Sequence, residues 1–265
     1  MPIAALTDLD LYYERGGAGP PLLFISGTGG DLRVQPNVLA SPLARSFDLL
    51  AYDQRGLGRT AKPPGPYSMA EYADDAAALL DHVGWDSALV VGVSFGGMVA
   101  QELVLRHPSR VKRLVLACTS PGGDGGASYP FHQIEHLKGE DRARFLMPIS
   151  DTRRDAAWQA AHPEDYERFV QLAAADPYAG EPGRAQGAHW QLGARARHDT
   201  WDRLLQIGCP VLIAAGRYDG IALPATQERM AARIPGAALR WFEGGHLFML
   251  QDRTAYPAIV DFLNS

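Results

Sequence analysis

Short apolar runs of strand length alternate with helix-length segments along most of this 265-residue chain. This alternation is typical of a mostly parallel β-sheet that is covered by helices on both faces. The strand-length runs lie at 9–14, 22–25, 49–52, 88–93, 114–117, 211–215 and 238–242. The expected helices lie at 35–45, 68–83, 95–106, 224–234 and 255–263. The pattern therefore predicts an α/β fold, with the run at 9–14 as an antiparallel strand at one edge of the sheet.

The alternation breaks between Pro121 and about Thr200, where proline, glycine, aromatic and charged residues are mixed. The sequence Gly-Gly-Asp-Gly-Gly at 122–126 predicts a flexible hinge, because glycine tolerates the backbone angles that a change of direction needs. Short helices are expected at 156–162 and 166–175. Since ligands of open α/β sheets bind at the carboxyl ends of the strands, we interpret this stretch as a helical cap over that edge.

The predicted organisation is a single core domain with one insertion. The core comprises residues 1–120 and 203–265, and the helical cap at 121–202 is inserted after the sixth strand. A chain of 265 residues is long enough for one α/β domain with such an insertion, so two independent domains are not required.

Composition and charge narrow the class of protein. Apolar residues make up 46% and charged residues 21%, which is ordinary for a globular domain and argues against a disordered or fibrous chain. The net charge is −5 and the basic residues are scattered, so neither a nucleic acid nor an anionic membrane is an expected partner. No stretch approaches the roughly 18 apolar residues of a membrane span, and residues 1–10 lack the pattern of a secretory leader. We expect a cytoplasmic protein, with Cys118 and Cys209 as reduced core residues.

The strongest local signal is Gly-Val-Ser-Phe-Gly-Gly at 92–97, which follows an apolar strand and precedes a helix-length segment. This context fits a nucleophile elbow, in which a tight strand-to-helix turn presents the hydroxyl of Ser94 above the sheet edge. Side chains at Gly92 and Gly96 would collide across such a turn. An ordinary glycine-rich turn is the alternative. A dinucleotide-binding fingerprint fits less well, because its second glycine would stand at the position of Ser94.

A serine hydroxyl at neutral pH is a poor nucleophile unless a neighbouring base is held in one tautomer. Asp219 and His246 follow the last two expected strands of the sheet, in the chain order serine, acid, histidine that the elbow predicts. Asp124, at the start of the predicted cap, is a rival for the acid. His189 and His198 are more distant substitutes for the base.

Two further motifs complete a family resemblance. They are Asp-Gln-Arg-Gly-Leu-Gly-Arg-Thr at 53–60 and Ser-Gly-Thr-Gly-Gly at 26–30. With the elbow, they make nearly the whole chain resemble the α/β-hydrolase superfamily. Within it, the chain resembles small cap-bearing bacterial esterases and lactonases, including 3-oxoadipate enol-lactonases and cofactor-free haloperoxidases. The sequence departs from the family at Ser26, where the family commonly has a histidine that organises the loop.

The resemblance implies an α/β-hydrolase fold and a serine hydrolase that cleaves a carboxylic ester or lactone through an acyl-serine intermediate. Ser94, Asp219 and His246 would be the catalytic residues. By matching position, the backbone N–H groups of Thr28 and Phe95 would form the oxyanion hole. Neither a metal nor an organic cofactor is implied.

The substrate is expected to be a small, apolar ester or lactone. Candidate contacts are Leu247 and Phe248 beside the base, and Trp190 and Phe131 in the predicted cap. The alternative is that the cap aromatics pack the cap onto the sheet. Assembly into a homo-oligomer is left open.

Three other functions remain open from the sequence. A carbon–carbon bond hydrolase acting on diketones and a haloperoxidase or perhydrolase would use the same triad. A receptor-like protein of this fold would bind its ligand with slow or no turnover.

Overall fold

The computed structural model describes residues 2–265, and its centre is an eight-stranded sheet in the order β1-β2-β4-β3-β5-β6-β7-β8. β1 pairs antiparallel with β2, β2 pairs antiparallel with β4, and all other neighbours are parallel. The strands are β1 (Ile3–Ala5), β2 (Asp10–Gly16), β3 (Pro21–Ile25), β4 (Asp48–Tyr52), β5 (Ala88–Val93), β6 (Val111–Ala117), β7 (Val211–Gly216) and β8 (Ala238–Phe242). The predicted α/β fold is confirmed. The strand expected at the edge, at 9–14, corresponds to β2, which is second in the sheet, and the unexpected strand β1 forms the edge.

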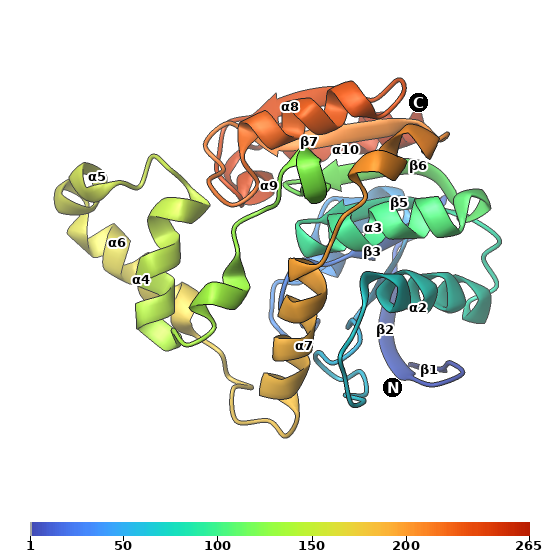
Figure 1. Cartoon of the computed structure of the whole chain (residues 1–265), viewed down its shortest axis with the longest axis horizontal. Helices are drawn as coiled ribbons and strands as arrows, with labels where there is room; N and C mark the ends of the chain where they lie inside the picture. Colours follow the sequence, from blue (N-terminus) through green and yellow to red (C-terminus); the bar gives the residue numbers. More distant parts are fainter. Residues whose placement is uncertain (1) are drawn as a thin grey trace.

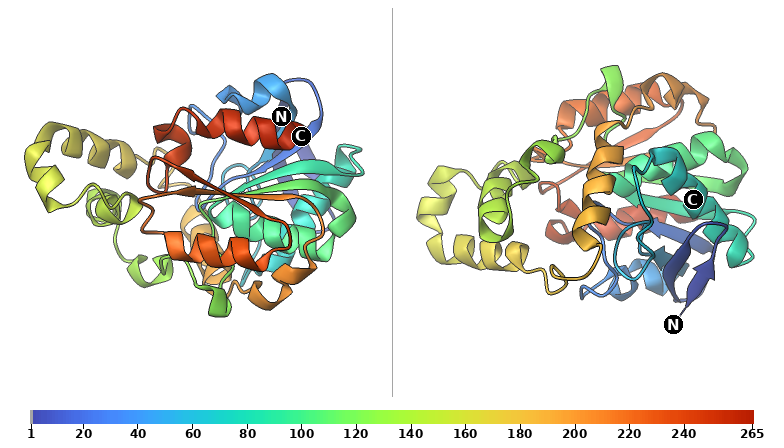
Figure 2. Two further views of the ribbon diagram at one scale, coloured as in Figure 1. Left: turned by 90° about the horizontal axis from the view of Figure 1, so that it is seen from above. Right: turned by 60° about the horizontal axis from the view of Figure 1, so that its bottom comes forward.

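Helices cover both faces of this sheet (Figures 1 and 2). Successive strand residues point to opposite faces, so Leu23 joins one apolar core while its neighbour Leu22 joins the other. The first core includes residues of α2 (Met69–His82), α3 (Phe95–Arg106) and α8 (Pro224–Arg233). The second includes residues of α1 (Leu43–Ser46), α9 (Phe248–Gln251) and α10 (Ala255–Asn264). Among residues 2–265, no helix combines the length and apolar character that crossing a membrane requires.

The prediction of a helix at 35–45 is wrong. The segment forms only a short 3-10 turn, η1 (Val38–Ala40), followed by the four-residue helix α1. Pro42 explains the break, because a residue before proline is driven out of the helical region, and Ser41 is extended with φ −80° and ψ 165°. Asn37 caps η1 by accepting a hydrogen bond from the Leu39 N–H group.

Residues 121–202, which we call the cap segment, contain α4 (Gly139–Ser150), α5 (Ala156–Ala161), α6 (Pro163–Ala174) and α7 (Arg184–Ala196). α4, α5 and α6 stand to one side of the sheet, whereas α7 lies close to the loops of the core (Figure 1). The short helices expected at 156–162 and 166–175 correspond to α5 and α6. α4 and α7 were not expected.

The two ends of the cap segment are joined to each other. Gly122 and Asp199 form a β-bridge, and the Thr200 N–H group donates to the Pro121 carbonyl oxygen at 2.8 Å. A Cβ atom at Gly122 would overlap the carbonyl oxygen of His198. Gly123–Gly125 form a 3-10 turn, η3. The glycines at 122–126 thus allow a close backbone crossing where the chain leaves the core and returns to it.

The backbone of helix α7 packs directly against the backbone of the core. A Cβ atom on Gly187 would overlap the carbonyl oxygen of Gly56, and one on Gly65 would overlap the ring of Trp190. Glycine at 187 and 56 is therefore what lets α7 pack closely against the 53–60 loop.

Candidate active site

Ser94 lies in a tight turn between β5 and α3. Its backbone has φ 55° and ψ −116°, a conformation that non-glycine residues rarely adopt. A Cβ atom on Gly92 would overlap the carbonyl oxygen of Gly96, and one on Gly96 would overlap that of Ile25. This is the geometry of a nucleophile elbow, in which a strained turn presents the serine hydroxyl at the carboxyl edge of the sheet.

His246 lies between β8 and α9, with its ring between the two other members of the predicted triad. Its Nε2 atom is 3.0 Å from Ser94 Oγ, and its Nδ1 atom is 2.8 Å from Asp219 Oδ2. An ionised carboxylate can only accept hydrogen bonds, so Nδ1 carries the proton and Nε2 is left as the acceptor. In this tautomer the ring can take the proton of the serine hydroxyl.

Asp219 follows β7 and is almost fully buried. Its Oδ1 atom accepts hydrogen bonds from the N–H groups of Ile221 and Ala222, at 2.7 and 2.9 Å, which fixes the plane of the carboxylate. The rival Asp124 lies in η3 with an exposed side chain, and its carbonyl oxygen accepts a hydrogen bond from Arg229. Of the two candidate acids, the structure brings only Asp219 to His246.

The end of α4 in the cap segment touches the loops that carry the acid and the base. The His246 N–H group donates to the Ser150 carbonyl oxygen at 2.6 Å, and the Gly220 N–H group donates to that of Ile149 at 3.0 Å. Both bonds join backbone to backbone, so they do not depend on the side chains at 149 and 150.

The predicted oxyanion loop, residues 26–30, lies directly beside the nucleophile. A Cβ atom on Gly27 would be 3.4 Å from Ser94 Cβ. Within residues 2–265, neither the Thr28 nor the Phe95 N–H group donates to a protein acceptor. Both donors are therefore available to an oxyanion formed at Ser94, although their catalytic role stays a prediction.

Two glutamines hold this loop, and neither role was expected from the sequence. Gln54 donates from Nε2 to the Ser26 carbonyl oxygen at 2.8 Å. Gln191 of α7 accepts the Gly29 N–H group on Oε1 at 2.9 Å. Gln191 is fully buried, and its Nε2 atom has no acceptor within the described part of the chain. A buried amide of this kind cannot be told apart in sequence from an exposed surface glutamine.

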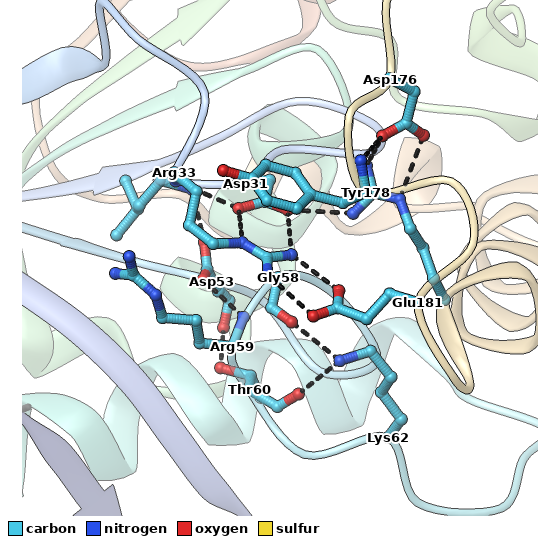
Figure 3. A network of polar contacts seen from close by, with 12 residues as sticks. Asp31, Arg33, Asp53, Gly58, Arg59, Thr60, Lys62, Asp176, Tyr178 and Glu181 are labelled. Carbon is cyan, nitrogen blue, oxygen red and sulfur yellow. Dashed lines mark hydrogen bonds and ion pairs between the residues drawn. The ribbon is translucent and has the colours of Figure 1, made fainter.

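The same loop continues into an ion network with the cap segment (Figure 3). The Arg33 guanidinium binds both carboxylate oxygens of Glu181, at 2.7 and 2.8 Å, and stacks on the ring of Tyr178. Asp31 accepts hydrogen bonds from Arg33 and from Arg184. Burial alone would raise the pKa of Asp31, but these hydrogen bonds outweigh it and lower the pKa to about 2.

Asp53, from the 53–60 motif, has an architectural position. Its carboxylate accepts the N–H groups of Leu32 and Arg59, at 2.7 and 2.8 Å, and so ties the 53–60 loop to the 26–33 loop. Burial of this carboxylate raises the pKa of Asp53 to about 6, partly offset by the two backbone hydrogen bonds.

The four predicted substrate contacts lie in different surroundings in the structure. Phe248 does not line the site, because its ring is fully buried in the sheet core and stacks on Phe242 with centroids 5.0 Å apart. Phe131 packs in a small apolar cluster that joins the cap segment to Ile221 of the core, with the Arg195 guanidinium 4.2 Å from its ring centroid. Trp190 packs on Gly65 of the core. Leu247, next to the base, is the exposed member, with 54% of its surface accessible.

Neither of the two rival histidines is hydrogen-bonded to Ser94 or Asp219. The His189 ring contacts Glu135 at 3.0 Å on the surface, and His198 is buried, which lowers its pKa to about 3. Cys118 and Cys209 are free thiols. Within residues 2–265, no cluster of three or more histidine, cysteine or acidic side chains is arranged to hold a metal ion.

Comparison with known proteins supports the predicted fold. The family model described as the alpha/beta hydrolase fold matches residues 20–252. A poly(3-hydroxyalkanoate) depolymerase of Ectopseudomonas oleovorans is 31% identical over 245 residues, covering 92% of this chain and 84% of the relative. A 3-oxoadipate enol-lactonase of Acinetobacter baylyi is 27% identical over 257 residues, covering 96% of this chain and 92% of the relative.

A solved structure extends the comparison of the fold. The crystal structure of an enol-lactonase from Burkholderia xenovorans superposes with a TM-score of 0.80 at 24% identity, covering 100% of both chains. The family model spans most of the chain, and the mostly parallel sheet flanked by helices is the fold that the resemblance implied. The chain belongs to the alpha/beta hydrolase fold family.

Proposed function

We propose that the chain is a serine hydrolase that cleaves a carboxylic ester or lactone of a small substrate through an acyl-serine intermediate. The observation that carries this proposal is the hydrogen-bonded series from Ser94 Oγ through the His246 ring to Asp219, with distances of 3.0 and 2.8 Å. The names of the relatives, a depolymerase of poly(3-hydroxyalkanoate) and an enol-lactonase, support a substrate of this class.

The first half of the reaction forms the acyl-enzyme. Ser94 Oγ attacks the carbonyl carbon while its proton passes to Nε2 of His246, and the carbonyl oxygen becomes an oxyanion beside the N–H groups of Thr28 and Phe95. When the tetrahedral intermediate collapses, the bond to the alcohol oxygen breaks and that oxygen takes the proton from His246. In a lactone, the released alcohol stays attached to the acyl chain.

The second half releases the acid. A water molecule gives its proton to His246 Nε2 and attacks the acyl carbon, and collapse returns that proton to Ser94 Oγ. Asp219 keeps the ring in one tautomer and stabilises the imidazolium that forms in both halves. Since two backbone N–H groups hold the carboxylate of Asp219, the ring needs little reorientation between the steps.

The test combines turnover with covalent labelling. We expect the purified chain to hydrolyse p-nitrophenyl acetate and butyrate or members of a panel of γ- and δ-lactones. A fluorophosphonate probe should label it on the peptide that contains Ser94, and Ser94→Ala should abolish both signals. Labelling without turnover of any ester or lactone would favour a ligand-binding protein, and an absence of both would contradict the proposal.

A further inference from the structure

The oxyanion loop has one internal backbone hydrogen bond, from the Gly30 N–H group to the Gly27 carbonyl oxygen at 3.2 Å, and is otherwise rich in glycine. Three of its five residues, Gly27, Gly29 and Gly30, are glycines, and Gly29 has φ +73°. Glycine leaves the backbone free to rotate, so the direction of the Thr28 N–H group depends on what holds its neighbours. An oxyanion donor is effective only when it is fixed before the charge develops.

The restraint next to Thr28 comes from the cap segment. The Gly29 N–H group, one residue away, donates to Gln191 Oε1 at 2.9 Å. Because an N–H group needs an acceptor, this contact also decides which atom of the Gln191 amide is oxygen. The neighbouring ion pairs of Arg33 with Glu181 and of Asp31 with Arg184 join the same two segments further along.

The stability of the folded state does not by itself explain a glutamine at position 191. It is fully buried, and its Nε2 group has no acceptor among residues 2–265. An unpaired buried amide donor destabilises the folded state, so an apolar side chain of similar size would suit the packing better. Among the described residues, the Gln191 side chain makes one hydrogen bond, to Gly29, and this bond acts on the loop beside the nucleophile.

We propose that Gln191 is a positioning residue for the oxyanion hole: the cap helix α7 fixes the Gly29 peptide and thereby the Thr28 donor. This inference rests on the proposed function, since it assigns Gln191 a part in stabilising the oxyanion formed at Ser94. It makes the cap segment a component of the catalytic machinery in addition to a cover for the substrate.

The test replaces the Gln191 amide by an apolar group of similar length. Gln191→Met removes the acceptor, and Gln186→Met, at an exposed position on the same helix, is the matched control. Loss of one oxyanion donor costs about 10²- to 10³-fold in rate, so loss of the group that holds it should lower kcat about 10- to 100-fold. We expect KM to stay within about threefold, because the effect acts on the transition state.

Two further measurements separate positioning from folding. The rate of fluorophosphonate labelling of Ser94 should fall in parallel with kcat, because the bound phosphonyl oxygen also occupies the oxyanion hole. The melting temperature of Gln191→Met should equal or exceed that of the wild type. Gln191→Leu should repeat both results.

Three outcomes would overturn the inference. One is a kcat and labelling rate within twofold of Gln186→Met. Another is a loss of activity that follows a loss of folded protein in both apolar variants, which indicates a structural role. The last is a wild-type chain with neither turnover nor labelling, because then the proposed function has failed and the inference falls with it.

Discussion

The two sides of the candidate site are tied to the cap segment in different ways. On the side of the acid and the base, the carbonyl oxygens of 149 and 150 at the end of α4 accept backbone hydrogen bonds from the loops of Asp219 and His246, and the Asp151 side chain adds one from Gln251. On the oxyanion side, the loop is held by side chains, those of Gln191, Glu181 and Arg184. Backbone contacts survive most substitutions, whereas a side-chain contact is lost with a single one. We therefore expect substitutions in the cap segment to disturb the geometry of the oxyanion loop more than that of the triad.

The largest effect is expected at the nucleophile itself. Ser94→Ala removes the attacking oxygen and should lower kcat by about 10⁴- to 10⁶-fold while the fold persists. Steady-state hydrolysis of p-nitrophenyl butyrate measures it, with far-UV circular dichroism as the control for folding. If Ser94→Ala kept a tenth of the activity, the hydroxyl would not be the nucleophile. The comparison of the two sides would then say nothing about catalysis.

A smaller loss is expected for the acid. Asp219→Asn keeps the shape but lets the His246 ring adopt the other tautomer, so kcat should fall by roughly 10³- to 10⁴-fold. Asp124→Asn is the matched control, because that side chain is exposed and away from the ring. Equal losses in the two variants would mean that the acid was assigned wrongly.

The ion network on the oxyanion side predicts a dependence of stability on pH. The pKa of Asp31 is lowered to about 2 in the folded chain, so the folded state holds this proton more weakly than the unfolded state does. The stability that Asp31 contributes is therefore present above about pH 4 and lost as the pH falls towards 2.

Chemical denaturation of the wild type and Asp31→Asn between pH 6 and 3 tests this. The free energies of unfolding should differ by on the order of 1–2 kcal/mol at pH 6 and converge as the pH falls. Burial and, to a smaller extent, the Asp31 charge raise the pKa of Asp53 to about 6, which changes the stability in the opposite direction over pH 4 to 6, so the convergence is read below pH 4. A difference that grows towards pH 3 would rule out the assigned ion pairs.

The smallest effect is expected where α4 meets the base. Ser150 supports His246 through its carbonyl oxygen, so Ser150→Ala should leave kcat within about twofold of the wild type. Assayed beside Gln191→Met, this variant gives the direct contrast between a backbone and a side-chain contact. A strong loss of kcat in Ser150→Ala would show that the two sides of the site do not differ in this way.

Local signals made the sheet and the meeting of Ser94, Asp219 and His246 predictable. Strand-length runs end where Ser94, Asp219 and His246 begin their loops, and the glycines at 92 and 96 are dictated by backbone collisions within the elbow. The pattern at 35–45 misled because the apolar spacing of a helix was present, while Pro42 excluded the conformation of the residue before it.

The cap helices were harder to predict for physical reasons. α7 contains Gly187 and Gly193 and follows Gly183, which has no side chain to cap it, and α4 contains Pro148, so the usual signals of helices are weak. Phe248 was misplaced because an apolar residue beside a candidate catalytic loop can face either a substrate or the core. Nothing in sequence distinguishes those two directions before the register of the following helix is known.

The bare backbone contact between Gly187 and Gly56 has a consequence for engineering the substrate range. A methyl group at 187 would act as a spacer that lifts α7 off the 53–60 loop. Gln191 lies one helical turn further along, so the lifted helix would carry its amide away from Gly29. Libraries that diversify the cap segment should therefore leave residue 187 unchanged, because a larger residue there would lower the catalytic rate of every member.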